Sequence, residues 1–364
     1  MSNRPEWLYK ASDTLPAWLE KISDAGTTGR FKFCVNGRTG AGEKAALGFS
    51  CFALRIFYTI GLWDKLDSGK KSEWIKFLQS FQSADGAFID APILKNCDSW
   101  KERLKRILLR RKGHRSVSFR QAVLNAETKQ AIATLAQVGA QALYPFEKFP
   151  SHPHDLKKYL SGLDWTQPWS AGGQAAAIAT FVKNESPKFL SPEDADRLLK
   201  EAVNFFTEMA DPETGTWFSG RVPAHYQMIN GAMKVLTALD WLECKIPYPE
   251  KLINTCLLSL PEQEGCHIVD YVYVLYRCCQ ATDHRRQEIL NYLKNILNII
   301  KRHYQPDGAF SYHETHNQTA YYGVKVAKAE RQSDLQATFL LCFAIAMIAS
   351  LTERDDLKWN VIRP

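Results

Sequence analysis

The chain alternates between two kinds of helix-length segment, and this alternation restricts the folds that it can adopt. Apolar segments begin near Glu43, Asn125, Ser170, Tyr226, Cys266 and Ser333. A more amphipathic segment precedes most of them, at 14–23, 71–83, 153–162, 192–209, 249–259 and 286–303. Helices that are apolar on nearly all faces are covered by protein, whereas amphipathic helices have a solvent side. Six of each kind predict an all-α fold, an (α/α)6 toroid whose inner helices surround a central cavity.

The order of the segments predicts a single toroid domain over residues 1–364. Ser191-Pro192-Glu193 combines a cap, a first-turn proline and a first-turn acid at the start of an outer helix. Ser333 and Gln336 have the spacing of a capping box at the start of the last inner helix. Two interruptions are longer than ordinary turns, a basic insertion at about 91–122 and a lid-like loop at about 304–332. Because both follow an outer helix, both are expected over the same rim.

The composition predicts a protein with a large hydrophobic core and with cysteines that stay reduced. It is 45% hydrophobic and 12% aromatic, and its nine cysteines include no CxxC pair. The first residues lack a signal-peptide pattern, and the longest apolar run, 335–351, is typical of a buried core helix. We therefore expect a cytoplasmic protein, peripheral to a membrane if its basic segment docks there.

The net charge of +7 comes from one segment. Residues 101–115 hold eight Lys or Arg and one acid, while the rest of the chain has equal numbers of basic and acidic residues. Apolar residues repeat at helical spacing from Trp100 to Leu108, with basic residues on the other faces. This pattern suits an anionic membrane surface, a polyanionic substrate or an acidic partner contacting 100–115, or a solvated helix. No base-reading module accompanies it, so no nucleic-acid partner is expected.

Three turns after outer helices share a sequence pattern. They read QSFQSADGAF at 79–88, DPETGTWF at 211–218 and YQPDGAF at 304–310. In each, Gly can supply a left-handed cap and the following aromatic can pack back between helices. The Q-x-x-D-G-x-F form resembles the QW-type repeat of squalene and hopene cyclases and of protein prenyltransferase β subunits. The resemblance implies a lipidic or isoprenoid small-molecule substrate in the central cavity, processed by cyclisation, isomerisation or elimination through proton transfer.

The fifth inner helix begins with residues that can carry chemistry, Glu264, Cys266 and His267, followed by Asp270. The resemblance to prenyltransferases places Glu264 and Cys266 where that family binds zinc, and His267, Asp270 or Asp334 could complete the site. Zinc needs three or four ligands and only two are matched. We expect no cofactor, with Glu264, Cys266 and His267 as weak metal candidates, and treat Glu264, Cys266 and Asp270 as candidate catalytic residues.

The fourth inner helix begins with a second pair of candidate catalytic residues, His225 and Tyr226. Either side chain can exchange a proton with a substrate oxygen or carbon. A satisfied histidine at a helix terminus is the structural alternative.

Other residues at the helix starts are candidates for binding substrate. Trp165 and Trp169 precede and open the third inner helix, and tryptophan faces stack on sugar rings, alkenes or cations. The remaining substrate-binding candidates are Gln174, Trp217, Arg221, Asn230, Tyr271, Tyr322 and Asp334. The segment 311–322, with His313 and His316, is interpreted as a lid rather than a metal site.

Two other functions remain open from the sequence. One is a carbohydrate-active toroid, a polysaccharide lyase, glycoside hydrolase or sugar epimerase, with His225 and Tyr226 transferring protons and Trp165 and Trp169 as the sugar platform. The other is a non-catalytic binding scaffold. The side chains that line the cavity distinguish these functions, because isoprenoids require apolar walls and sugars require polar groups around aromatic ones.

Overall fold

The computed structural model describes residues 6–97, 118–262, 264–353 and 357–364. By their contacts the chain divides into two compact units. Unit 1 is drawn from 1–80, 260–272 and 287–362, and unit 2 from 81–259, 273–286 and 363–364. Most of the predicted basic insertion, including the 100–115 surface, lies outside the described residues. The single-domain organisation stays a prediction.

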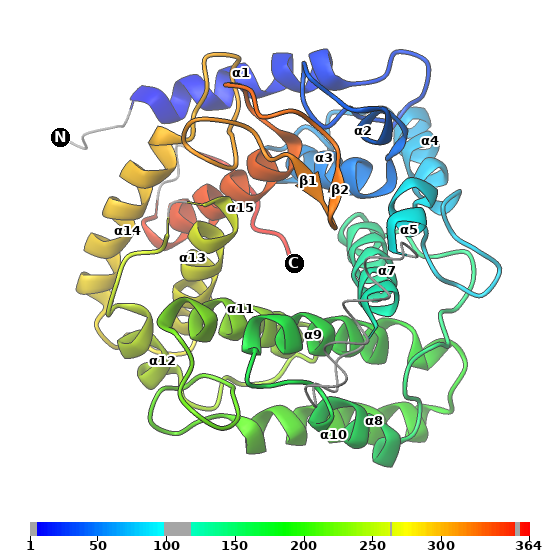
Figure 1. Ribbon diagram of the computed structural model, residues 1–364. Coiled ribbons are helices and arrows are strands. Elements are labelled where there is room, and N and C mark those ends of the chain that lie inside the picture. The colour runs from blue at the N-terminus through cyan, green and yellow to red at the C-terminus, as the bar shows by residue number, and fades with distance from the viewer. Residues whose placement is uncertain (1–5, 98–117, 263, 354–356) are drawn as a thin grey trace. The chain divides into compact units, whose positions relative to one another are not determined.

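Unit 1 contains helices from both ends of the chain. They are α1 (Glu6–Ile22), α2 (Gly40–Lys44), α3 (Leu47–Thr59), α4 (Ser68–Gln79), nearly all of α14 (Arg286–Arg302), α15 (Leu335–Leu351) and the first part of α13 (Gly265–Cys279). A short antiparallel hairpin joins β1 (Ala320–Tyr321) to β2 (Val324–Lys325). The inner helices α3 and α15 pack side by side (Figure 1), with the rings of Phe52 and Phe339 stacked at 5.2 Å.

Unit 2 contains the middle of the chain. Its elements are α5 (Ala91–Cys97), α7 (Phe119–Gln137), α8 (Pro153–Ser161), α9 (Pro168–Asn184), the 3-10 helix η1 (Ser186–Lys188), α10 (Pro192–Met209), α11 (His225–Trp241), α12 (Pro249–Cys256) and the last part of α13. The inner helix α9 packs against both α7 and α11 (Figure 1). A Cβ added to Gly231 of α11 would lie 2.9 Å from the backbone carbon of Pro168, so glycine lets these two helices approach closely.

Every helix predicted from the two segment types is present, and the cap of α10 lies where the sequence placed it. Ser191 Oγ accepts a hydrogen bond from Asp194 N at 3.1 Å. The cap of α15 differs from the expected one by a residue. Asp334 Oδ1 accepts from Ala337 N at 2.8 Å, whereas Ser333 Oγ donates to Asp307 at 2.8 Å. A carboxylate accepts more hydrogen bonds than a hydroxyl, and Asp334 uses this capacity in the site described below.

The turns after outer helices share one backbone device. Isolated β-bridges close four of them, Ser23 to Phe31, Gln82 to Phe88, Ala210 to Trp217 and Tyr304 to Phe310. In each, a glycine with positive φ stands two residues before the aromatic: Gly29, Gly86, Gly215 and Gly308. Two of these aromatics donate their N–H to a threonine of the next inner helix, Phe88 to Thr128 at 3.1 Å and Phe310 to Thr338 at 3.2 Å. The turn at Phe31 was missed in the sequence because only its Gly-x-aromatic end matches.

Outer and inner helices joined by these turns confirm the predicted fold class, an all-α fold of the (α/α)6 toroid type. Among the described residues, no helix combines the length and apolar character needed to cross a membrane.

Candidate functional site

The start of α13 meets the loop that precedes α15, both within unit 1. Glu264 forms an isolated β-bridge with His313, and Gly265 N donates to Tyr312 O at 3.1 Å. A Cβ added to Gly265 would lie 3.3 Å from the Tyr312 ring, so the loop lies directly on the first turn of the helix. We call the side chains gathered here the Glu264–His313 cluster: Glu264, Cys266, Tyr312, His313 and His316.

His313 is the residue of this cluster that lies opposite Glu264. Its Nδ1 lies 3.9 Å from Glu264 Oε1, and its ring stacks on His316 with centroids 4.4 Å apart. Burial lowers the pKa of His313 below its ordinary 6.5, the neighbouring His316 lowers it further, and Glu264 opposes both. The imidazole is therefore neutral at neutral pH and can accept a proton, while 30% of the side chain stays exposed.

Tyr312 is the buried phenol of the cluster. Its side chain is 6% exposed, and its phenol is hydrogen-bonded to Cys266. Burial, then Cys266 and the charges of Glu264 and Asp270, raise the pKa of Tyr312 well above 10. The phenol keeps its proton at physiological pH. Asp270, a predicted catalytic residue, is 1% exposed on the same helix and acts on Tyr312 through its charge.

Asp334 holds the loop in position. Its Oδ2 accepts from Tyr312 N and from Gln318 N, each at 2.9 Å, in addition to the helix cap at Oδ1. Burial raises the pKa of Asp334 to about 6 even though three backbone N–H groups favour the carboxylate. The side chain is completely buried. This geometry makes it a support for the cluster, whereas the sequence had suggested a substrate contact.

Further bonds tie the same loop to α14 and to the turn that follows it. His303 Nδ1 donates to Ser311 O at 2.8 Å, and Gln305 Nε2 donates to Ser311 Oγ at 2.7 Å. Arg302 and Glu314 form an ion pair at 2.8 Å. The backbone beside His313 is therefore fixed from several sides.

No group of three or more His, Cys, Asp or Glu side chains within the described part of the chain is arranged to hold a metal ion. Of the weak zinc candidates, Glu264 and Cys266 belong to the cluster. His267 is buried, with its Nε2 3.8 Å from Glu262 Oε2.

The start of α11, in unit 2, presents a different arrangement. His225 Nε2 donates to Thr255 O at 2.7 Å, and Ser259 Oγ donates to His225 Nδ1 at 2.9 Å. Because Thr255 lies in the last turn of α12, the imidazole caps that helix. Both ring nitrogens of His225 are used by the protein.

The other residues near the start of α11 differ in burial. Tyr226 is half-buried, Arg221 is exposed and Asn230 is completely buried. These side chains share a helix entry with His225, whereas the Glu264–His313 cluster is built from other elements.

The predicted tryptophan platform is largely inside the core of unit 2. Trp165 is 3% exposed and its Nε1 donates to Leu160 O at 2.9 Å. Trp217 is 1% exposed and donates to Phe206 O at 2.7 Å. A buried indole cannot stack on a ligand, whereas Trp169 is half-buried. Gln174 accepts a hydrogen bond from Asn125 Nδ2 at 3.1 Å.

Two predicted tyrosines of unit 1 also differ in exposure. Tyr271 is 1% exposed within α13. Tyr322 is half-buried at the tip of the hairpin, where its φ is 44° and its ring lies 4.5 Å from Tyr321.

Sequence reasoning named Glu264, Cys266 and Asp270 but did not join them to Tyr312 and His313. The signal was present as a run of His, Glu and Tyr immediately before an inner helix. Its partner is about 50 residues away in the chain, and the two segments meet only in the folded protein, at the β-bridge between Glu264 and His313 and the bond from Gly265 N to Tyr312 O.

The sequence matches no protein-family profile and no curated protein. Among solved structures, the chain is similar to a polysaccharide lyase at 11% identity, with 97% of this chain and 98% of that chain covered and a TM-score of 0.48. It is similar to a family 76 glycoside hydrolase from a bovine Bacteroides thetaiotaomicron strain at 10% identity, with coverage of 95% and 78% and a TM-score of 0.46. A possible member of glycoside hydrolase family 105 from Salmonella enterica serovar Paratyphi A matches at 14% identity, with coverage of 95% and 94% and a TM-score of 0.42.

These comparisons correct the function expected from the sequence. The prediction of a terpenoid-cyclase or prenyltransferase-like enzyme acting on a lipidic or isoprenoid substrate is wrong, since the similar structures are named as carbohydrate-active enzymes. The turns explain the error. Their glutamines bond neighbouring loops and the turns themselves, and the N–H groups of Phe88 and Phe310 bond the next inner helix. Gln82, for example, accepts from Leu143 N at 2.7 Å and donates to Gly86 O at 2.9 Å. Such a motif specifies a helix connection and carries no information about substrate.

Proposed function

We propose that this protein is a carbohydrate-active enzyme, a polysaccharide lyase that uses the Glu264–His313 cluster for proton transfer. The observation that carries the proposal is a neutral, partly exposed imidazole whose Nδ1 lies 3.9 Å from a carboxylate. A β-elimination requires a base that accepts the proton and an acid that returns it to the departing oxygen, and one histidine can serve as both.

In the proposed reaction, His313 removes the proton from the ring carbon beside the carboxylate of a uronic acid residue. The electron pair of that bond forms a double bond to the neighbouring ring carbon, whose bond to the glycosidic oxygen breaks. The imidazolium of His313 then gives that proton to the departing oxygen, which regenerates the base. The Glu264 carboxylate stabilises the imidazolium that forms, as carboxylates do for catalytic histidines elsewhere. No water is consumed, and one product carries a new unsaturated end.

The charge of the chain is consistent with a polyanionic substrate. The formal net charge of +7, all of which comes from residues 101–115, attracts acidic polymers over a distance set by the ionic strength.

The test is degradation of a panel of acidic and neutral polysaccharides by the full chain. A lyase produces ultraviolet-absorbing unsaturated ends, and His313→Ala and Glu264→Gln should reduce their formation. The matched controls are His154→Ala and Glu193→Gln, which change exposed residues. If reducing ends form without the new absorbance, the enzyme is a hydrolase and the proposed lyase reaction is wrong. No degradation of any polymer in the panel would overturn the proposal.

A further inference from the structure

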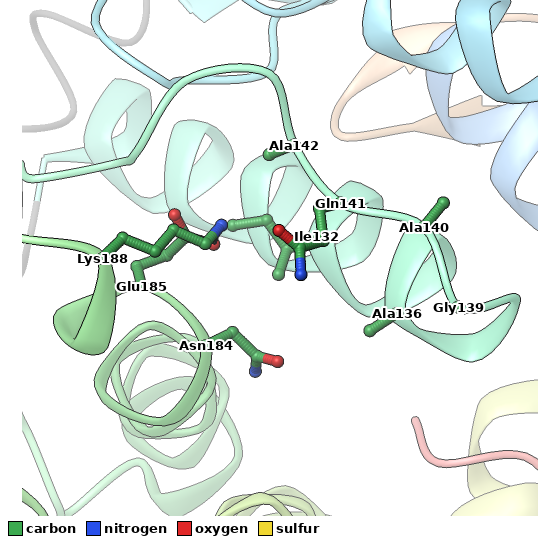
Figure 2. A pocket seen from close by; sticks show the side chains of 9 residues that line it. All are labelled: Ile132, Ala136, Gly139, Ala140, Gln141, Ala142, Asn184, Glu185 and Lys188. Atoms are coloured by element: carbon green, nitrogen blue, oxygen red, sulfur yellow. Dashed lines mark hydrogen bonds and ion pairs between the residues drawn. The ribbon is translucent and has the colours of Figure 1, made fainter.

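Unit 2 contains a pocket that shares no residue with the Glu264–His313 cluster. It has a volume of about 260 Å³ and lies at the C-terminal ends of α7 and α9. Figure 2 shows the side chains that line it: Ile132, Ala136, Gly139, Ala140, Gln141, Ala142, Asn184, Glu185 and Lys188. Pockets for drug-sized ligands measure roughly 300–1,000 Å³, so this one suits a single small ring.

The polar groups of the pocket are fixed in place. Glu185 is completely buried. Its Oε1 accepts a hydrogen bond from Lys188 Nζ at 2.7 Å, and its Oε2 accepts one from Phe146 N at 3.0 Å. Because the ammonium neutralises the carboxylate, the pocket has no net charge and offers little attraction to a strongly charged ligand.

The same groups offer both donors and acceptors to a ligand. Lys188 has three N–H donors, of which Glu185 takes one. Asn184 uses its Nδ2 to donate to Thr180 O at 2.9 Å, which leaves Oδ1 as an acceptor. In Figure 2, the side chains of Asn184, Gln141 and Lys188 extend toward a common space beside Ile132 and Ala136. Hydroxyl groups both donate and accept, so a polyhydroxylated molecule fits this mixture.

An exposed aromatic residue follows the pocket in the chain. Leu143 and Tyr144, directly after the lining residue Ala142, are 58% and 47% exposed. Their backbone is held by Gln82, whose Oε1 accepts from Leu143 N at 2.7 Å and from Tyr144 N at 3.0 Å. A tyrosine that is exposed on a fixed backbone can offer its ring to the apolar face of a sugar.

We propose that this pocket binds one uncharged sugar ring, such as the terminal residue of a glycan, with Tyr144 contacting the part of the glycan outside. Ile132 and Ala136 meet the apolar face of the ring, and Asn184 and Lys188 bond its hydroxyls. The site is separate from the proposed lyase chemistry and does not depend on it.

The experiment titrates the full chain with neutral methyl hexosides, and with glucuronate and glycine as charged comparisons, by calorimetry and ligand-observed NMR. At least one neutral hexoside should bind, and Asn184→Ala and Lys188→Met should each weaken its binding tenfold or more. The controls Asn204→Ala and Lys200→Met change exposed residues of α10 and should leave binding unchanged.

Lys188→Met removes the partner of a buried carboxylate, so thermal unfolding is measured for each variant. Asn184→Ala keeps the ion pair and decides the result if Lys188→Met does not fold. The proposal is overturned if no neutral hexoside binds at millimolar concentration, if binding survives Asn184→Ala unchanged, or if glucuronate or glycine binds more tightly than every neutral sugar.

Discussion

His225 and His313 both lie at or beside the first turn of an inner helix, and their rings have different partners. His225 has both ring nitrogens engaged, with Thr255 O at 2.7 Å and Ser259 Oγ at 2.9 Å. His313 lies with its Nδ1 3.9 Å from a carboxylate, beyond hydrogen-bond distance, and with a lowered pKa. His225 is the first residue of α11, whereas His313 lies in the loop before α15 and contacts the start of α13, and the partners of the two rings differ.

Under the proposed function, the partners of the two rings separate a structural histidine from a catalytic one. An imidazole whose nitrogens are consumed by a helix cap cannot accept a substrate proton without losing the cap. An imidazole held by stacking and by a nearby carboxylate keeps a nitrogen for proton transfer. The partners of each ring therefore indicate which histidine is available for proton transfer. The positions of the two residues in the sequence do not.

The largest expected effect is on catalysis. His313→Ala should lower kcat/KM for the polysaccharide substrate by roughly 10²–10⁴, the usual contribution of a general base. His225→Ala should change it far less, because that ring is occupied. Steady-state kinetics of the two variants on one substrate measure the difference. If His225→Ala caused the larger loss, the two histidines would have to exchange the roles given to them here.

The next effect is on the support of the cluster. Asp334→Asn places an amide N–H₂ against the N–H groups of Tyr312 and Gln318 that now bond Oδ2, and buried donors left unsatisfied cost about 1–3 kcal/mol each. We expect the free energy of unfolding to fall by about 3 kcal/mol, with activity reduced in the protein that still folds. Chemical denaturation measures this change. Asp196→Asn, on the exposed face of α10, is the control. Equal stability of the two variants would show that Asp334 is not a support.

Much of the fold could be predicted from the sequence because helix signals are local. Apolar content along 335–351 and the cap and proline at 191–192 each depend on residues within one helix, and each predicted helix is present. The cap of α15 was predicted one residue early because Ser333 and Asp334 are both good caps, and only long-range bonds choose between them.

The candidate site was harder to predict because its geometry is not local. Glu264 was recognised at a helix start, but the residues that make it useful lie in a distant loop. Trp165 and Trp217 were expected to face a ligand, although a large indole fills a gap between helices equally well, and both are buried. The isoprenoid function was wrong because the turn motif reports a helix connection that unrelated chemistries share.

A smaller effect, on the free energy of unfolding, distinguishes His225 from His313. His225→Ala removes the donor to Thr255 O at the end of α12, and a typical hydrogen bond contributes about 1 kcal/mol. His313→Ala, whose ring makes a stacking contact at the surface of the loop, should cost less. Thermal and urea unfolding of both variants give the two values. A greater destabilisation by His313→Ala would mean that its ring is structural and would weaken the comparison.

The smallest and most specific effect is on the pH profile. A general base works when it is deprotonated, and the pKa of His313 is lowered by burial and by His316. The acidic limb of kcat/KM should therefore have its midpoint below 6.5, with full activity at neutral pH. Two substitutions should move this midpoint in opposite directions. Glu264→Gln removes the charge that raises the pKa, so the midpoint should fall. His316→Ala removes a neighbour that lowers it, so the midpoint should rise. His225→Ala, a change at a ring outside the cluster, should leave the midpoint unchanged. If neither Glu264→Gln nor His316→Ala moved the midpoint, the titrating group would not be His313. Another residue would then be the base.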